Sequence, residues 1–236
     1  MTSYPQIEPI SESLLIVRLG TEIDLRLNAA VHRLAGRIRL AQLRGVVDIA
    51  PAYASVSVRY QPGLWRSRDQ NAFAALAAAL MPLLDSADTD RGAPRRIEIP
   101  VCYGGDFGID LESAAQSCRL ASLDFIRLHA SADYRVAMLG FAPGFPYLLG
   151  LPTQLHLQRR AQPRLQVPPG SVAVGGAQTG IYPNALPGGW HLIGRTPLRL
   201  FDAASEEPCL LAAGDAVRFR RISVAEFNAW TDAPIR

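Results

Sequence analysis

The sequence predicts an α+β protein with two domains: a small α/β domain over residues 1–92 and a β-barrel domain over residues 93–236. Three observations support this prediction. Before residue 85, apolar residues recur alternately at strand spacing and at helix spacing. The stretch DSADTDRGAP at residues 85–94 is polar and rich in turn formers, as linkers are. After it, short apolar runs separated by Gly and Pro favour a barrel or a sandwich.

The first domain is predicted to alternate strands and helices. The order is strand, helix, strand, strand, helix, strand, at residues 14–19, 27–38, 46–49, 56–60, 73–84 and 97–101. Asp24 is placed to cap the first helix. This β-α-β-β-α-β order is the split pattern of ferredoxin-like domains. The alternative is that the strand Ile97–Val101 belongs to the second domain.

The second domain is predicted to begin with helical pieces and to continue with strands. Helices are expected at Leu111–Cys118 and Leu123–His129. The strands are expected at residues 171–174, 190–193, 198–201 and 216–221.

Composition excludes several classes of function. All 24 basic residues are arginines, so a P-loop, a Schiff base and a biotin-carrying lysine are excluded within these residues. The arginines are scattered and have no interleaved aromatic residues, which argues against nucleic-acid binding. The first residues lack a signal-peptide pattern, and the apolar run at residues 73–84 is too short to cross a membrane. Because three widely spaced cysteines fit reduced thiols, we expect a cytoplasmic protein.

Glycine and proline concentrate in one region. Residues 140–196 hold ten of the 19 glycines and eight of the 18 prolines. Within it, MLGFAPGFPYLLGLP at residues 138–152 carries no charge. Tight barrel turns would explain any single Gly-Gly pair. Taken together, the stiff prolines and the exposed glycine N–H groups predict a binding site.

Charge in the same region points to an anionic ligand. Residues 134–201 contain no Asp or Glu but six arginines, a formal charge of +6. Carboxylates or phosphates are therefore the expected ligands. An acid for catalysis must come from outside this stretch, either from a partner or from one of four residues: Asp106, Asp110, Asp133 or Asp202. A site shared between two different chains is thus expected.

Four segments carry a resemblance to a known family: VCYGGDFGIDL at residues 101–111, MLGFAPGFPYLLGLP, PRLQVPPGSVAVGG at 163–176, and QTGIYPNALPGGWHLIGRTPLRLFD at 178–202. They closely resemble the family of the 5-oxoprolinase B subunit, also called allophanate hydrolase subunit 1 or KipI. EIDLRLNAAV in the first domain is similar too. The resemblance implies a cyclophilin-like barrel after a small α+β domain. It also implies two partners in the 5-oxoprolinase complex, a KipA-like C subunit and an A subunit.

The reaction that the resemblance implies is the opening of the 5-oxoproline lactam to L-glutamate, coupled to ATP hydrolysis. ATP with Mg is therefore the expected cofactor, bound jointly with a partner chain. A lactam amide is a poor electrophile, and phosphorylation of its oxygen would activate it. Such a step depends mainly on positioning and charge neutralisation, which suits an acid-free region that bears arginines.

Candidate site residues follow from these motifs. Asp106 is the candidate catalytic base or Mg ligand, and His129 is a catalytic candidate, although its position at a helix C-terminus is better explained by capping. Arg195 and Thr196 are expected to hold a carboxylate or phosphate, or to tie loop carbonyls together. The other candidate binding residues are Phe141, Pro143, Gly144, Phe145, Gln178, Thr179 and Tyr182. Apart from the Mg that would be bound together with ATP, no metal site is predicted.

Rival functions stay open at this point. A KipI-type protein would bind and inhibit a sensor histidine kinase. A carboxyltransferase-like protein would serve a urea or allophanate pathway with a biotin-dependent partner. Peptidyl-prolyl isomerase activity would rest on fold analogy alone and ranks last.

Overall fold

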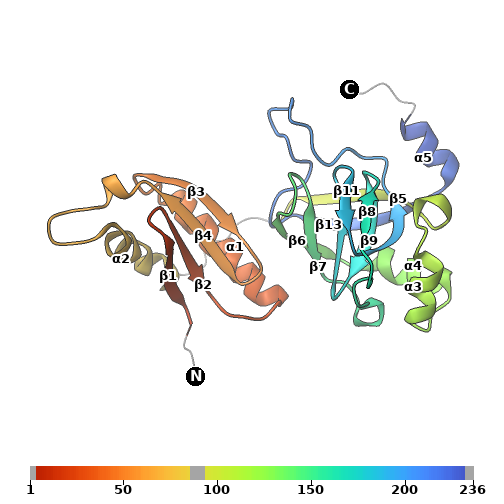
Figure 1. Ribbon diagram of the computed structural model, residues 1–236, viewed down its shortest axis with the longest axis horizontal. Coiled ribbons are helices and arrows are strands. Elements are labelled where there is room, and N and C mark those ends of the chain that lie inside the picture. Colours follow the sequence, from red (N-terminus) through yellow and green to blue (C-terminus); the bar gives the residue numbers. More distant parts are fainter. Residues whose placement is uncertain (1–3, 86–93, 232–236) are drawn as a thin grey trace. The chain divides into compact units, whose positions relative to one another are not determined.

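The structure is a computed structural model that describes residues 4–85 and 94–231 (Figure 1). Its contacts group the chain into two compact units, Met1–Ala93 and Pro94–Arg236. The boundary predicted between residues 92 and 93, and the linker residues 86–93, lie outside the described residues, so that boundary stays a prediction. Helices on an antiparallel sheet in one unit and a closed barrel in the other confirm the predicted α+β fold class.

The first unit is one sheet with two helices. Its elements are β1 (Gln6–Ser11), β2 (Leu14–Arg18), α1 (Leu25–Leu40), β3 (Val46–Pro51), β4 (Ser55–Tyr60), the 3₁₀ turn η1 (Pro62–Leu64) and α2 (Ala72–Asp85). The sheet order is β1-β2-β4-β3, with every neighbouring pair antiparallel. Its buried core combines Leu15 and Val58 of the sheet with Leu34 of α1 and Leu76 of α2. Burial of these apolar side chains is what holds the helices on the sheet.

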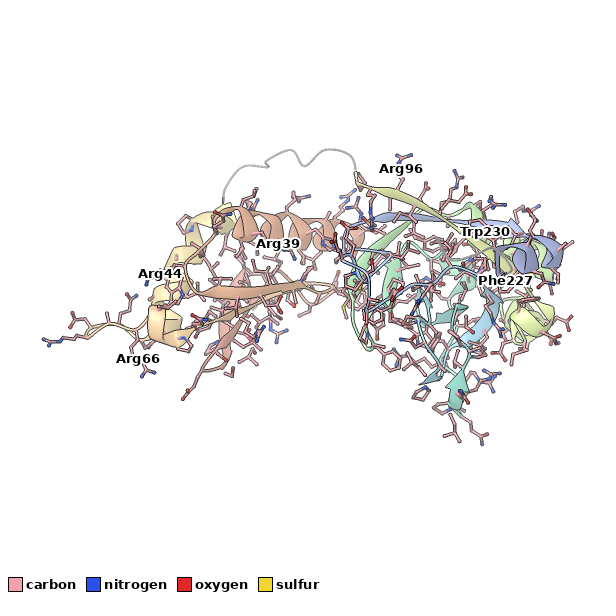
Figure 2. The ribbon with its side chains drawn as sticks, turned by 90° about the horizontal axis from the view of Figure 1, so that it is seen from above. Arg39, Arg44, Arg66, Arg96, Phe227 and Trp230 are labelled. Atoms are coloured by element: carbon pink, nitrogen blue, oxygen red, sulfur yellow. The ribbon has the colours of Figure 1, made fainter. Side chains whose placement is uncertain are left out.

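The start of α1 confirms the capping prediction. Asp24 Oδ1 accepts hydrogen bonds from the backbone N–H groups of Arg26, at 2.8 Å, and Leu27, at 2.9 Å. These two donors would otherwise lack partners in the first turn. Arg39 in the last turn of α1, and Arg44 and Arg66 after it, are exposed residues of this unit (Figure 2).

The ferredoxin-like strand order predicted for the first domain is wrong in its last strand. β5 (Arg96–Tyr103), which contains Ile97–Val101, pairs with barrel strands instead, as the stated alternative held. The edge position in the first sheet is taken by β1, which sequence patterns did not predict. β1 contains Pro9, and a proline is tolerated in an edge strand because one side of that strand needs no ladder donor.

The second unit is a closed barrel in the order β10-β7-β6-β13-β5-β12-β9. Besides β5, these strands are β6 (Tyr134–Leu139), β7 (Pro146–Leu149), β9 (Ser171–Gly175), β10 (Gln178–Ile181), β12 (His191–Arg195) and β13 (Ala216–Ile222). β13 lies parallel to β5, from Ala216 opposite Arg96 to Ile222 opposite Cys102. A separate two-stranded sheet joins β8 (Arg164–Val167) to β11 (Leu186–Gly188).

Helices close the barrel on one side (Figure 1). They are α3 (Leu111–Ser117), α4 (Ser122–Ser131) and α5 (Val224–Thr231), with short 3₁₀ turns η2 (Gly105–Phe107) and η3 (Thr153–Leu155). The interior core includes Phe125 of α4 together with Val172, Ile193 and Phe219 of the strands. On α5, Phe227 packs against Phe107 with ring centroids 4.6 Å apart, while Trp230 is half exposed (Figure 2). Within the described residues, no helix has the length and apolar character needed to cross a membrane.

The strand predicted at Leu198–Phe201 is wrong, since only an isolated bridge pairs Phe201 with Cys209. Pro197 has no N–H for a ladder, and the backbone N–H of Leu198 donates to Thr196 Oγ1 at 3.3 Å. Arg199 Nε donates to the Phe201 carbonyl at 3.2 Å. These local bonds compete with strand pairing.

Candidate functional site

The outer face of the barrel carries an aromatic cluster over β9, β10 and β12. Along β9, Val172 and Val174 belong to the interior core, whereas Ala173 packs with the outer cluster. Two glycines let aromatic rings approach the backbone on this face. A Cβ on Gly180 would lie 2.9 Å from Phe145 Cζ, and a Cβ on Gly175 would lie 2.5 Å from Trp190 Cδ1. A side chain at position 175 or 180 would therefore collide with these rings, so both positions need glycine.

These rings line a pocket of about 210 Å³. Its aromatic walls are Phe141, Phe145, Tyr147, Tyr182 and Trp190. Phe145 meets Tyr182 edge to face, with centroids 5.2 Å apart and an interplanar angle of 84°. Burial raises the pKa of Tyr182, so its phenol stays protonated at neutral pH. The walls thus offer apolar ring surfaces and neutral hydroxyls, as small-molecule sites do.

The loop before β7 holds Phe141 in a strained position. Phe141 has φ +67°, in the left-handed region, and its side chain is 60% exposed. A non-glycine residue in this region costs roughly 1–2 kcal/mol. Three short-range backbone bonds keep the loop closed, among them Phe145 N–H to the Ala142 carbonyl at 3.0 Å. Strain of this kind is concentrated at ligand sites, so the exposed ring at the pocket mouth favours a binding role.

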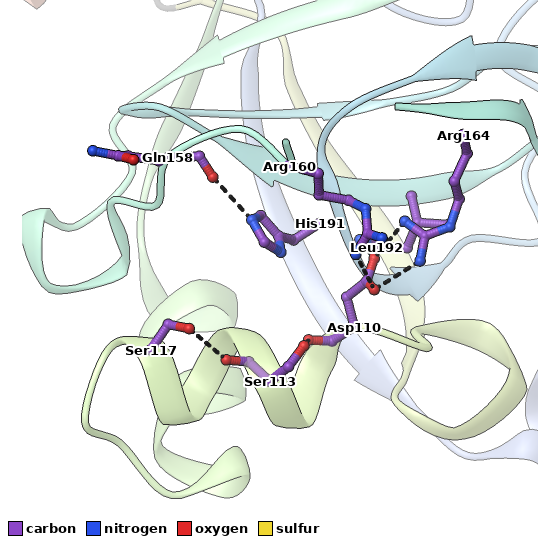
Figure 3. Close-up of polar contacts among 8 residues, drawn as sticks. All are labelled: Asp110, Ser113, Ser117, Gln158, Arg160, Arg164, His191 and Leu192. Atoms are coloured by element: carbon purple, nitrogen blue, oxygen red, sulfur yellow. Dashed lines mark hydrogen bonds and ion pairs between the residues drawn. The ribbon is translucent and has the colours of Figure 1, made fainter. Parts of the chain in front are cut away.

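Beside the pocket, Asp110 ties three segments together (Figure 3). Its side chain is almost fully buried and accepts both arms of the Arg164 guanidinium, at 2.9 and 2.8 Å. Arg160 Nη1, on the pocket wall, donates to the same carboxylate at 3.1 Å. The backbone N–H of Leu192 in β12 adds a fourth bond at 2.8 Å. Because the carboxylate is the common acceptor, it fixes β8, β12 and the start of α3 together.

Acids from outside residues 134–201 therefore neutralise part of the positive charge of this region, which contains no Asp or Glu of its own. Of the four candidate acids, Asp110 pairs with Arg160 and Arg164, and Asp202 pairs with Arg199 at 2.9 Å. Arg159 has no carboxylate partner within residues 4–85 and 94–231. Its Cζ lies 5.9 Å from the Trp190 ring centroid, at the pocket.

His129 lies in a separate place, inside the barrel. Thr179 Oγ1 donates to the Ala173 carbonyl at 2.9 Å, so it accepts from His129 Nε2–H at 3.1 Å. His129 Nδ1 then accepts from the Tyr103 hydroxyl at 2.8 Å. The ring has no solvent exposure, and burial lowers the pKa of His129 to about 3. A neutral ring with both nitrogens bonded favours a structural role, while the catalytic role stays a prediction.

Arg195 and the backbone of Asp106 come together at the end of β12 opposite Trp190, and Thr196 follows there. Arg195 Nη2 lies 3.5 Å from the Asp106 carbonyl oxygen, and its guanidinium lies over the Phe107 ring. Thr196 donates its backbone N–H to the Gly170 carbonyl at 2.9 Å. The Asp106 side chain is exposed, and the described part of the chain holds no group of three or more His, Cys, Asp or Glu residues able to bind a metal. These contacts fit the alternative in which Arg195 and Thr196 tie loop carbonyls together. A role of Arg195, Thr196 and Asp106 in binding a ligand stays a prediction.

The remaining candidates lie around the aromatic face. Gln178 pairs with Gly175 across β10 and β9, which puts its side chain on the same outer face as Trp190. Pro143 is exposed in the Phe141 loop. Gly144 has φ +79°, and a Cβ there would lie 2.8 Å from Phe201 Cβ. Glycine at position 144 thus lets the loop pack on the segment after β12.

Sequence reasoning missed several residues of this face. Arg159, Tyr147 and Trp190 were not predicted as site residues, although Trp190 stands directly after Gly188-Gly189 in the most glycine-rich motif. Asp110 was one of the four acids predicted to complete the region of six arginines, and the structure pairs it with Arg160 and Arg164.

Comparison with known proteins assigns the family. The family model described as "Carboxyltransferase domain, subdomain C and D" matches residues 5–211. The B subunit of 5-oxoprolinase from Bacillus subtilis (strain 168) is 40% identical over 237 residues, which covers 98% of this chain and 99% of that protein. The chain belongs to the 5-oxoprolinase B-subunit family. The family resemblance inferred from the four motifs is thereby confirmed.

A second member of this family, the B subunit of 5-oxoprolinase from Escherichia coli O157:H7, is 44% identical over 210 residues, covering 89% of this chain and 93% of that protein. Among solved structures, TTHA0988 superimposes with a TM-score of 0.76 at 36% identity. The match covers 89% of this chain but 40% of TTHA0988. The family fold thus also occurs within a longer chain.

Proposed function

We propose that this chain is the B subunit of an ATP-dependent 5-oxoprolinase, which opens 5-oxoproline to L-glutamate at a site shared with the KipA-like C subunit. The observation that carries the proposal is the 40% identity to the B subunit of 5-oxoprolinase from Bacillus subtilis over nearly the full length of both proteins. The proposed complex also contains an A subunit.

The aromatic pocket supports a small ring as ligand. Its volume of about 210 Å³ lies below the range of about 300–1,000 Å³ that drug-sized ligands occupy. A lactam ring presents two apolar faces, which suit the walls formed by Phe145, Tyr182 and Trp190. The cationic Arg159 at the pocket suits the carboxylate that 5-oxoproline carries.

A nucleotide fits these residues poorly. The chain has no lysine, and no acidic residue lines the pocket. The described residues also offer no acidic cluster for Mg. We therefore propose that ATP and Mg are bound jointly with the partner chain, and that the chain is inactive alone. Its own residues would bind and orient the lactam and exclude water from it.

The test is a pull-down of the tagged chain from its own host, followed by an assay of ATP hydrolysis that depends on 5-oxoproline. Activity in the eluate with a stoichiometric partner, and none in the chain alone, supports the proposal. A Phe141→Ala eluate should lose most of the activity, whereas Leu123→Ala, an equally exposed apolar site away from the pocket, should retain it. A co-purifying histidine kinase without 5-oxoproline-dependent activity would refute the proposal in favour of a regulator.

The carboxyltransferase description of the family model favours one second candidate, a component of a urea or allophanate pathway. The same eluate assayed with urea or allophanate in place of 5-oxoproline separates the two. ATP turnover with urea or allophanate alone would replace the first proposal by the second.

A further inference from the structure

Arg159 differs from the other arginines near the pocket in what its guanidinium contacts. The guanidinium lies over the face of Trp190, a cation–π contact that holds it against the pocket wall. The side chain is exposed, and across the described ranges it forms no ion pair. Its N–H edges therefore remain for a ligand, in the fork geometry that matches a carboxylate.

Arg160 and Arg164 are already engaged. Arg164 binds Asp110 through two nitrogens, and Arg160 shares that carboxylate through Nη1. The Arg160 backbone N–H also donates to the Gly189 carbonyl at 2.8 Å, which fixes its position beside Arg159. Asp110 thereby holds the guanidinium groups of Arg160 and Arg164 beside β12. Because Asp110 already neutralises them, they are not the groups that would bind an anionic ligand.

The charge of Arg159 reaches the polar groups of the pocket. Burial raises the pKa of both Tyr147 and Tyr182, and the positive charge of Arg159 partly opposes that increase at both phenols. Independently of these shifts, Tyr147, Tyr182 and Arg159 all line the same pocket. An anionic group in that pocket would lie near the Arg159 cation, while the Tyr182 hydroxyl is already hydrogen-bonded to the Trp190 backbone.

We propose that Arg159 is the specificity-determining residue of the pocket: it binds the carboxylate of a small flat ring that lies between the aromatic walls. The ligand class is the cyclic monocarboxylates. The inference rests on the proposed function only for the identity of the ring as 5-oxoproline. A nucleotide is not the ligand of this pocket, because the pocket is too small for a base, a sugar and phosphates together.

The test compares the purified full-length chain with its Arg159→Gln variant by isothermal titration calorimetry. The ligands are 5-oxoproline, 2-pyrrolidinone, which is the same ring without the carboxylate, furan-2-carboxylate, and ATP. Arg199→Gln is the matched control, since Arg199 is an exposed arginine of the same unit that pairs with Asp202 away from the pocket.

Arg159→Gln should weaken the binding of ring carboxylates by about 10- to 100-fold, the effect of a lost charge-assisted hydrogen bond, and leave 2-pyrrolidinone binding unchanged. The control should match the wild type with all ligands. Equal affinities of wild type and Arg159→Gln for the carboxylates, or no binding of any ring to the wild-type chain, would overturn the inference. Arg159-dependent binding of furan-2-carboxylate but not of 5-oxoproline would support it and contradict the proposed function.

Discussion

Replacing Asp110 by Asn should destabilise the barrel unit strongly, although the change adds no volume. One carboxylate oxygen accepts from Arg164 Nη1 and from the Leu192 backbone N–H, at 2.9 and 2.8 Å. The other accepts from Arg164 Nη2 and Arg160 Nη1. An amide NH₂ on either side would face two donors. Breaking a buried ion pair lowers the free energy of unfolding by about 3–5 kcal/mol. Because the two arginine side chains are 22–31% exposed, we expect a loss at the lower end, about 3 kcal/mol.

The assay is urea unfolding followed by the fluorescence of Trp190, in a chain where Trp65 and Trp230 are replaced by Phe, so that the signal reports on the barrel unit. Asp124→Asn is the control, because Asp124 pairs with Arg127 on the surface, where side chains are 44% and 76% exposed. Loss of this exposed ion pair should lower the free energy of unfolding by less than about 1 kcal/mol. If the two variants unfold at the same urea concentration, the ion pairs of Asp110 do not hold the barrel together.

Three further predictions concern other contacts. His129 has a pKa of about 3 in the folded chain, below its ordinary 6.5, so its stabilisation is complete above pH 6.5 and is lost as pH falls toward 3. Between pH 7 and pH 5, the free energy of unfolding measured in urea should fall by about 2 kcal/mol more for the wild type than for His129→Gln. If the free energy of unfolding depends on pH in the same way for both proteins, the His129 ring is not held buried and neutral. Gly144→Ala should lower the melting temperature by several degrees, since a Cβ there meets Phe201 at φ +79°, whereas Gly63→Ala, with open space around it, should not. Arg195→Ala should abolish 5-oxoproline-dependent ATP turnover by the assembled complex if Arg195 holds a ligand, whereas wild-type turnover with a lower melting temperature would assign it the loop-tying role that its contacts with Asp106 and Phe107 indicate.

Local rules predicted the elements whose causes are local. Asp24 caps α1 because its carboxylate reaches donors two and three residues away, an arrangement visible in sequence. The strand at Ile97–Val101 was found correctly, but its partner β13 begins 120 residues after Arg96. No periodic pattern specifies which sheet a strand joins, so the predicted strand order wrongly placed it in the first sheet, although the predicted boundary between residues 92 and 93 put it in the second domain.

The same limit applies to the candidate site. Phe145 and Tyr182 were predicted from the Gly/Pro motifs and do line one pocket, together with Phe141. Arg195 and His129 were predicted beside them, yet the structure puts one at another end of the barrel and the other in its interior. Composition identified a region that favours anions. That Arg160 and Arg164 are paired with an acid while, within the described residues, the neighbouring Arg159 is not depends on Asp110, which lies 50 residues before Arg160 in sequence.

The parallel pairing of β5 with β13 also constrains the order in which the protein can fold during synthesis. The barrel cannot close until Ala216–Ile222 has left the ribosome, although its first strand was made more than a hundred residues earlier. The first unit has its own core and can fold long before that moment. Until β13 is made, the sheet that the other barrel strands can form has two open edges, at β5 and β6. Cellular factors that bind exposed strands should therefore act on the nascent barrel rather than on the domain made first.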